Sequence, residues 1–223
     1  MRKLLLTALL IPQLLFGQKT FIPDNVFENY LENNMMGDGI ANNDSVLTAN
    51  INTTTSVDIT SLGIADLTGI ADFTALEWLH CGFNLLTDLN LDSNISLLGV
   101  YCWYNQLTVL DVSHNINLQA LMCEYNSLTT LDIRNGNNIN MVTDPINGFS
   151  TVGNPTLSCI MVDDTAWATA NWTYTGLNID STHYFSLNCN ALSWDCLDGA
   201  CIDYGLGTGI YATLSDCQAT CSI

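Results

Sequence analysis

Three consecutive segments of the chain align without a gap at a period of 21 residues: LEWLHCGFNLLTDLNLDSNIS (76–96), LLGVYCWYNQLTVLDVSHNIN (97–117) and LQALMCEYNSLTTLDIRNGNN (118–138). Such self-similarity at a fixed period is typical of repeat proteins, in which each repeat packs on the next one. The columns that persist through all three segments are Leu76/Leu97/Leu118, Leu79/Val100/Leu121, Cys81/Cys102/Cys123, Asn84/Asn105/Asn126, Leu86/Leu107/Leu128, Thr87/Thr108/Thr129, Leu89/Leu110/Leu131 and Leu91/Val112/Ile133.

Each repeat alternates apolar and polar residues over two short stretches, such as LHC (79–81) and LDV (110–112). Alternation with a period of two predicts short β-strands. Equivalent strands of successive repeats then pair in parallel, about 4.8 Å apart. The inward side chains of all repeats join into one core that no single repeat could form. The sequence therefore predicts a solenoid with short parallel strands.

Two asparagine columns mark the ends of these stretches: Asn84/Asn105/Asn126, and Asn94/Asn115, which ends at Gly136. An asparagine amide has donors and an acceptor for backbone groups where the chain turns inward. We therefore expect these side chains to hydrogen-bond to the neighbouring coils.

Weaker copies flank the three clear repeats and extend the predicted solenoid over residues 55–160. Upstream, Val57, Ile59, Ile64 and Leu67 match the inward columns at an offset of 22. Downstream, five residues are expected to keep the 21-residue period: Ile139, Val142, Asn147, Phe149 and Val152. After a shortened turn, residues 154–157 are expected to return to the repeat at the positions of residues 115–118.

The two half-units of each repeat, Leu79-x-Cys81-xx-Asn84 and Leu89-x-Leu91-xx-Asn94, resemble the leucine-rich repeat family, in particular its 21-residue IRREKO class. The stretch SLGIADLTGIADFTAL (61–76) is similar to an internalin-type coil, and TFIPDNVFENYLE (20–32) resembles the lead-in of secreted repeat proteins from Bacteroidota. The resemblance covers about half of the chain and is specific to the fold. It implies a binding module and does not name a ligand.

The first 18 residues have the basic start, apolar run and small residue of a secretory signal peptide. We expect a secreted protein, extracellular or at the cell surface, with no membrane insertion. Removal of the signal peptide changes the net charge from −18 to −20, because Arg2 and Lys3 are lost. A chain with this excess of negative charge repels nucleic acid. Nine cysteines fit an oxidising compartment.

Residues 19–54 are predicted to form an N-terminal cap whose helix begins at Pro23-Asp24 and presents one apolar face. That face consists of Val26, Phe27, Tyr30 and Leu31. By resemblance and position, residues 161–189 form the matching C-terminal cap, stapled by a Cys159–Cys189 disulfide. Its expected plug consists of Trp167, Trp172, Ile179 and Phe185.

Residues 190–223 are predicted to be a small cysteine-rich module. Such a short unit buries too little surface to fold unaided, so two disulfides are the expected staple, and a zinc site is the less favoured alternative. The spacing leaves the connectivity open among Cys196, Cys201, Cys217 and Cys221. The three cysteines of the repeats are expected to be free, buried and chemically inert; a disulfide between neighbouring rungs is an alternative.

No catalytic or nucleotide-binding motif is present in the sequence, so we expect no enzyme. No cofactor is expected, although the loop 37–44 contains the hard oxygen ligands Asp38, Asn42 and Asp44 that calcium prefers. An ordinary turn is the favoured interpretation of this loop, because Asn, Asp and Gly are the usual turn residues and the EF-hand spacing is lacking.

The outward positions of the first strand in each repeat, and the position just beyond it, carry large side chains. We call this set the aromatic ridge: Trp78, His80, Phe83, Tyr101, Trp103, Tyr104, Met122, Glu124 and Tyr125. An exposed ridge of this kind marks a contact surface. We expect a monomer that binds a protein in interaction or adhesion, with a surface glycan as the alternative partner. In a third interpretation the solenoid is a spacer and residues 190–223 bind the partner. The competing structural interpretation is that the rings only stack and cover the turn.

Overall fold

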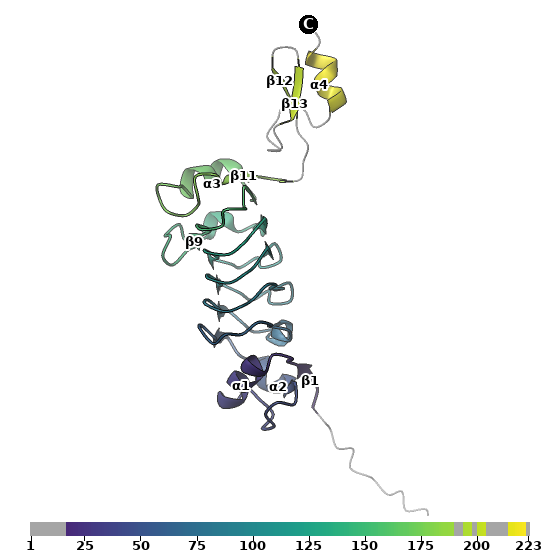
Figure 1. The fold of residues 1–223 in the computed structure, drawn as a ribbon, viewed down its shortest axis with the longest axis vertical. Coiled ribbons are helices and arrows are strands. Elements are labelled where there is room, and N and C mark those ends of the chain that lie inside the picture. Colours follow the sequence, from purple (N-terminus) through teal and green to yellow (C-terminus); the bar gives the residue numbers. More distant parts are fainter. Residues whose placement is uncertain (1–16, 190–193, 198–199, 204–213, 222–223) are drawn as a thin grey trace, which may run out of the picture.

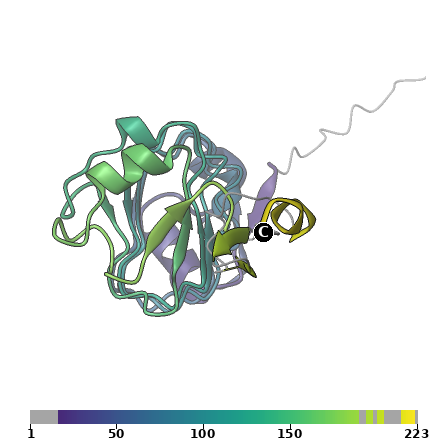
Figure 2. The same cartoon turned by 90° about the horizontal axis from the view of Figure 1, so that it is seen from above.

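A computed structural model describes residues 17–189, 194–197, 200–203 and 214–221 of the chain. The coils stack along the long axis of the molecule, and they superpose when viewed along the stack (Figures 1 and 2). Of the predicted signal peptide, only Gly17 and Gln18 belong to the described residues. Within the described ranges, every helix is too short or too polar to cross a bilayer.

One side of the stack is a five-stranded parallel sheet, here called the first sheet, built from the Leu-x-Cys stretches. Its register places Leu79 beside Val100 and Val100 beside Leu121, as the repeat alignment predicts. In sheet order the strands are β3 (Ser56–Asp58), β4 (Trp78–His80), β5 (Gly99–Tyr101), β7 (Ala120–Met122) and β9 (Phe149–Ser150).

The other half-units form a second parallel sheet of four strands, with Leu110 beside Leu131 and Leu131 beside Ile160. The predicted repeat solenoid with short parallel strands is thereby confirmed. In sheet order the strands are β6 (Val109–Asp111), β8 (Thr130–Asp132), β10 (Cys159–Met161) and β11 (Tyr184–Ser186). The last strand, β11, extends this sheet from the segment that the sequence assigned to the C-terminal cap.

The core lies between the two sheets and consists of the inward columns of the repeats, which are almost completely shielded from solvent. Cys81, Cys102 and Cys123 are part of it and carry free thiols, as expected. Two short 3-10 turns, η1 (Ile70–Asp72) and η2 (Asn138–Asn140), line the connection between the sheets.

The first asparagine column joins each coil to the coil before it. The Asn105 side chain accepts a hydrogen bond from the Leu86 backbone N–H at 3.0 Å and donates to the carbonyl oxygens of Cys81 and Cys102, both at 3.0 Å. Asn84 and Asn126 make equivalent bonds. These amides satisfy buried backbone groups at the turn, which is the role that the sequence predicted.

The predicted register downstream of residue 138 is wrong. Phe149, rather than Val142, pairs with Leu121, so the spacing is 28 residues instead of 21. The extra residues form a loop, 142–148, that we call the insert loop; the Gly148 N–H donates to the Asp144 carbonyl oxygen at 2.8 Å. Asn154, not Asn147, continues the asparagine column, because its amide bonds to Leu128 and Cys123.

The N-terminal segment folds over the first coil as β1 (Lys19–Phe21), α1 (Asn25–Asn33), β2 (Ser45–Leu47) and α2 (Thr48–Ile51), with β1 and β2 antiparallel. Asp24 caps α1 by accepting hydrogen bonds from the Val26 and Phe27 backbone N–H groups. Phe27 and Leu31 are buried and Tyr30 packs against the core, whereas Val26 lies exposed, contrary to the expected apolar face. The apolar face of α1 is therefore narrower than predicted.

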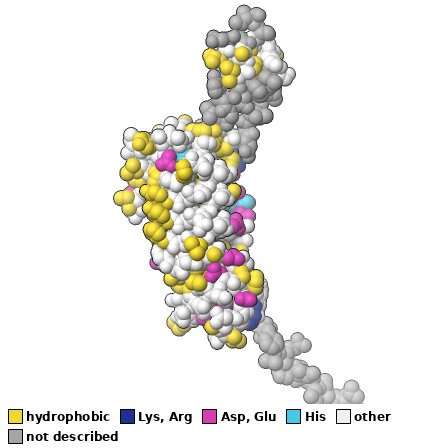
Figure 3. All heavy atoms as spheres, viewed as in Figure 1, with side chains coloured by type: hydrophobic (Ala, Val, Ile, Leu, Met, Phe, Trp, Pro, Cys, Tyr) yellow, Lys and Arg dark blue, Asp and Glu magenta, His cyan; other side chains and the backbone are white. Residues whose placement is uncertain are grey.

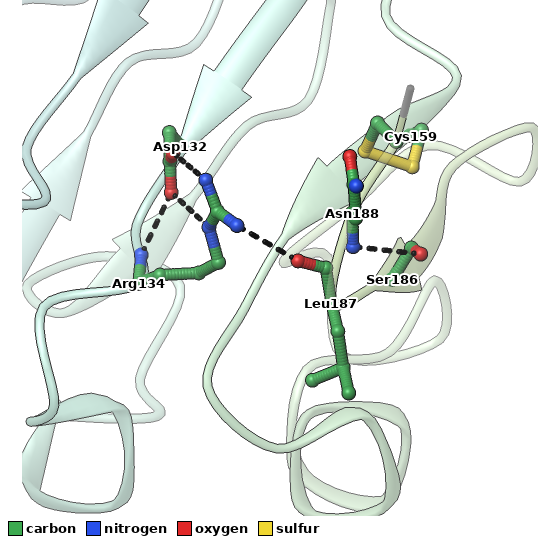
Figure 4. Close-up of a disulfide and its surroundings, with 7 residues drawn as sticks. Asp132, Arg134, Cys159, Ser186, Leu187 and Asn188 are labelled. Carbon is green, nitrogen blue, oxygen red and sulfur yellow. Dashed lines mark hydrogen bonds and ion pairs between the residues drawn. A yellow bond between two sulfur atoms is a disulfide. The ribbon is translucent and has the colours of Figure 1, made fainter. Parts of the chain in front are cut away.

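At the opposite end, α3 (Thr165–Asn171) and β11 cover the last coil, and Trp172 is fully buried there. A Cys159–Cys189 disulfide ties this segment to β10, as the resemblance implied. Beside it, the Arg134 guanidinium donates to the Leu187 carbonyl oxygen and to the Asp132 carboxylate, both at 2.9 Å (Figure 4). A disulfide and a hydrogen bond from Arg134 thus hold the segment that follows β11 against the second sheet.

Beyond residue 193, the described residues form an antiparallel pair, β12 (Trp194–Leu197) and β13 (Ala200–Asp203), and a helix, α4 (Leu214–Cys221). Two disulfides link them, Cys196–Cys221 and Cys201–Cys217. The sulfur atoms of Cys201, Cys217 and Cys221 lie within 4.8 Å of one another. The disulfides account for this grouping without zinc.

Candidate binding surface

The aromatic ridge divides into two groups of rings along the first sheet. On the strands, Tyr101 is central: its ring stacks on His80 at a centroid distance of 4.5 Å and on Trp78 at 6.3 Å, and meets Trp103 edge-on at 5.6 Å. All four side chains are half-buried. They therefore form a continuous, partly exposed band of rings across β4 and β5.

Trp103 lies flat against the preceding coil because Gly82 leaves room for it. A methyl group on Gly82 would lie 2.7 Å from atoms of the Trp103 indole, closer than carbon atoms approach without displacement. The repeat thus combines a glycine in one coil with a tryptophan in the next, and this pairing fixes the orientation of the indole.

The second group, which we call the turn column, consists of Phe83, Tyr104 and Tyr125. Neighbouring rings stack at centroid distances of 4.5 and 4.4 Å. Even so, the three side chains remain 51 %, 44 % and 50 % exposed. Stacking covers the faces between the rings but leaves their edges open to solvent.

All three residues of the turn column have left-handed backbone conformations, with φ of 54°, 51° and 53°. This conformation costs a non-glycine residue about 1–2 kcal/mol. The equivalent turn positions of the coils before and after the column, Ser61 and Gly153, also have positive φ. The turn imposes the conformation, and only the three central coils place large rings there.

Two members of the ridge lie differently from the sequence prediction. Met122 and Glu124 were expected to face solvent, but they are only 6 % and 9 % exposed. The insert loop packs beside them: its Pro145 and Ile146 line the same groove as Met122, Glu124 and the turn column. The Tyr101 hydroxyl also donates a long hydrogen bond, 3.5 Å, to the Asn147 carbonyl oxygen of this loop.

The ridge and the insert loop together enclose a groove of about 350 Å³. Figure 3 shows one face of the solenoid, where hydrophobic side chains gather into a stripe along the stack. The residues that line the groove are Phe83, Trp103, Tyr104, Met122, Glu124, Tyr125, Pro145 and Ile146. Pro145 and Ile146 are not among the predicted site residues; the extra chain length between residue 138 and Asn154 is the signal in the sequence that points to them.

Glu124 is the charged member of the groove. Burial raises the pKa of its carboxyl group, while its own backbone N–H and the Ser150 side chain act in the opposite direction and do not compensate. Its Oε2 atom is buried and has no hydrogen-bond partner. Such an oxygen is costly to leave unpaired.

The outward face of the second sheet differs in character. Val109 is exposed there, but the nearby side chains are polar, and His114 lies 3.3 Å from the Asp92 carboxylate. The Arg134–Asp132 pair lowers the pKa of the Asp132 carboxyl: burial alone would raise it, and the hydrogen bonds from Arg134 outweigh that effect. The aromatic residues of this sheet lie at its C-terminal end, where Tyr184 and Phe185 of β11 line a separate pocket of about 380 Å³ with Trp172 and Tyr174.

The loop that the sequence nominated for calcium is occupied by the protein's own groups. The Lys19 ammonium lies 2.6 Å from the Asp38 carboxylate, and the Asn43 amide donates to both Asp38 oxygens. Glu32 and Glu28 accept hydrogen bonds from the backbone N–H groups of the same loop. Asn42 and Asp44 adopt left-handed turn conformations. This arrangement is that of an ordinary turn.

The sequence of this chain matches no protein-family model and no curated protein. Its structure is similar to three solved structures of Listeria monocytogenes internalins. The first is the functional domain of InlJ, which includes a cysteine ladder, at a TM-score of 0.47 and 26 % identity over 66 % of this chain. The others are internalin InlF (0.47, 18 % identity, 74 % of this chain) and internalin C2 (0.33, 15 % identity, 76 % of this chain). The matched regions cover 34 %, 56 % and 98 % of those chains, so this chain spans only part of the first two.

Proposed function

We propose that this protein is a secreted or surface-exposed, non-catalytic leucine-rich-repeat module that binds a protein partner in interaction or adhesion. The turn column carries the proposal: three large rings occupy left-handed turn positions and remain about half exposed. A turn needed only for folding is more stable with Gly or Asn at such positions. Exposed aromatic side chains in a row are typical of contact surfaces.

The groove beside the column supports a protein partner over a surface glycan. Sugars bind by lying on open ring faces, and here the rings of Phe83, Tyr104 and Tyr125 cover one another. What stays open is a set of ring edges and a narrow apolar groove, which suit an inserted side chain. A glycan remains the second candidate, and a glycan array with calcium present is its direct test.

The non-catalytic part of the proposal is supported by the state of the thiols. Burial raises the pKa of Cys81 to about 12, and the pKa values of Cys102 and Cys123 are raised well above the usual value, again through burial. A thiol needs to be deprotonated to act as a nucleophile. These three side chains therefore serve packing.

We further propose that the chain belongs to the IRREKO class, derives from a Bacteroidota-like source and is exported. Three disulfides favour an oxidising compartment. The proposed division is a signal peptide (1–18), an N-terminal cap (19–54), a solenoid (55–160), a C-terminal cap (161–189) and a cysteine-rich module (190–223). In this arrangement both caps shield the open ends of the core.

The test uses a partner captured from the natural surroundings and identified by mass spectrometry. A double variant, Trp103→Ala with Tyr104→Ala, should fold and lose at least tenfold in affinity for that partner. Tyr174→Ala is the matched control, because Tyr174 is a 59 % exposed aromatic residue outside the ridge. Equal binding by wild type and double variant would refute the proposal, and loss on deleting 190–223 alone would assign binding to that module.

A further inference from the structure

We propose that the groove between the turn column and the insert loop receives a lysine side chain from the partner, with its ammonium group paired to Glu124. This inference rests on the proposed function and specifies the chemistry of the partner. It draws on three observations: an unpaired buried carboxylate oxygen, aromatic walls, and the absence of an internal cation near Glu124 among the described residues.

The first observation concerns the polar group at the base of the groove. Glu124 is 9 % exposed and lines the groove, and its Oε2 atom has no hydrogen-bond partner. A carboxylate turns readily about its terminal bond, since that torsion has a broad energy profile. A donor that enters the groove can therefore reach this oxygen and satisfy it.

No basic side chain of the described residues is available for this role. Lys19 pairs with Asp38, and Arg134 pairs with Asp132 and the Leu187 carbonyl oxygen. Neither contacts Glu124. The described residues therefore supply no cation to Glu124, and the net charge of −18 attracts cationic partners.

The walls of the groove suit an alkyl chain that ends in a cation. Met122, Pro145 and Ile146 are apolar contacts for methylene groups, and the rings of Trp103, Tyr104 and Tyr125 are within the same lining. These rings add apolar surface and keep water out of the groove, which strengthens the attraction between an ammonium group and the Glu124 carboxylate. A lysine side chain presents both parts in one unbranched piece.

Lysine fits better than arginine because the groove has one free acceptor. A guanidinium binds a carboxylate best through two parallel hydrogen bonds. Only Oε2 of Glu124 is unpaired and buried. An ammonium group needs no second oxygen in the same plane, so a single acceptor surrounded by rings matches it.

The experiment uses the full chain and three capped pentapeptides, Gly-Gly-X-Gly-Gly, in which X is lysine, norleucine or arginine. Binding is followed by NMR through the indole N–H signal of Trp103, assigned with a Trp103→Phe variant. The lysine peptide should produce a saturable shift. Norleucine keeps the alkyl chain and lacks the ammonium group, so its affinity should be lower by about tenfold or more. Arginine should bind more weakly than lysine.

Glu124→Gln should reduce lysine-peptide affinity by about tenfold, since the amide keeps the size and removes the charge. Asp111→Asn is the matched control: it removes one negative charge from an exposed position on the second sheet and should leave affinity unchanged. Equal affinity for lysine and norleucine, or unchanged affinity in Glu124→Gln, overturns the inference.

The outcomes also separate this inference from the proposed function. If no peptide binds while the Trp103 and Tyr104 double variant still loses the captured partner, the lysine inference fails and the proposed function stands. If the lysine peptide binds Glu124-dependently while the double variant keeps its partner, the groove is a lysine site and the ridge is not the partner surface.

Discussion

The Tyr125 ring lies directly over the Cα of Gly153, the residue that occupies the equivalent turn position in the next coil. A methyl group on Gly153 would lie 2.6 Å from Cδ1 of Tyr125, and Gly153 has a φ of +76°. Two features therefore require glycine at this position: the backbone conformation and the close approach of the Tyr125 ring. No larger residue fits beneath that ring, so the column of stacked rings ends at Tyr125.

Gly153→Ala should destabilise the protein through both effects. The left-handed conformation costs about 1 kcal/mol for alanine, and the clash adds about 1–3 kcal/mol. Gly136→Ala is the matched control, since Gly136 has a φ of +75° and nothing within 4 Å of its added methyl group. Urea denaturation should show the larger loss for Gly153→Ala, and a second change, Tyr125→Ala, should restore most of the difference. Equal losses for the two glycine variants would mean that Tyr125 yields without cost.

The asparagine column gives a second prediction. Asn105→Ala removes the acceptor of the Leu86 N–H and a donor to the Cys81 and Cys102 carbonyl oxygens. The unfolding free energy should fall by about 1–3 kcal/mol for each group left unpaired. Asn117 makes one exposed bond to the Ile95 carbonyl oxygen, so Asn117→Ala should change stability by no more than about 0.5 kcal/mol. Similar effects from both variants would contradict a structural role for the buried column.

The columns were predictable because the same backbone hydrogen bonds recur in every coil. A residue such as Asn105 serves neighbouring turns at once, so its spacing in the sequence is the spacing of the coils. The insert loop was not predictable in this way. Ile139 and Val142 match the apolar pattern locally but are exposed, and only the pairing of Phe149 with Leu121 reveals the register.

The composition of the ridge was predicted better than its exposure. Alternation along the strands correctly placed Tyr101 and Trp103 outward, because the direction of a side chain follows from its position in the strand. The burial of Met122 and Glu124 depends on the insert loop, which lies more than 15 residues further along the chain and packs there through tertiary contacts. A period-two pattern contains no information about such a cover.

Glu124 should oppose folding at neutral pH. Burial raises the pKa of its carboxyl group in the folded state above the usual 4.5. At a pH between the usual pKa, which applies to the unfolded state, and the raised pKa of the folded state, the folded state binds more protons than the unfolded state. The free energy of unfolding therefore falls as pH rises through this window and stays low above it. Its neighbours Cys102, Cys123 and Tyr104 have raised pKa values and stay uncharged there. Glu124→Gln should therefore raise the unfolding free energy at pH 7 by about 1 kcal/mol, which corresponds to a Tm increase of about 2–4 °C.

The gain from Glu124→Gln should shrink as pH falls through the raised pKa toward 4.5, because the wild-type carboxyl then becomes neutral as well. Thermal unfolding from pH 4.5 to 8 measures this directly. Asp111→Asn, which removes one negative charge from an exposed position, is the control for the change in net charge. A loss of stability in Glu124→Gln at pH 7 would mean that the ionised carboxylate is satisfied in the folded protein.

The cysteines should fall into two sets that alkylation can separate. Six are joined in disulfides, and Cys81, Cys102 and Cys123 are free and fully buried. Burial raises the pKa of Cys81 to about 12 and those of the other two well above the usual value, so almost no thiolate exists at pH 8. Iodoacetamide should leave the native protein unmodified. It should add three groups in urea without reductant and nine groups after reduction, as read by mass spectrometry. Modification of any repeat cysteine in the native state, at the rate of a cysteine peptide, would show that the core opens between the coils.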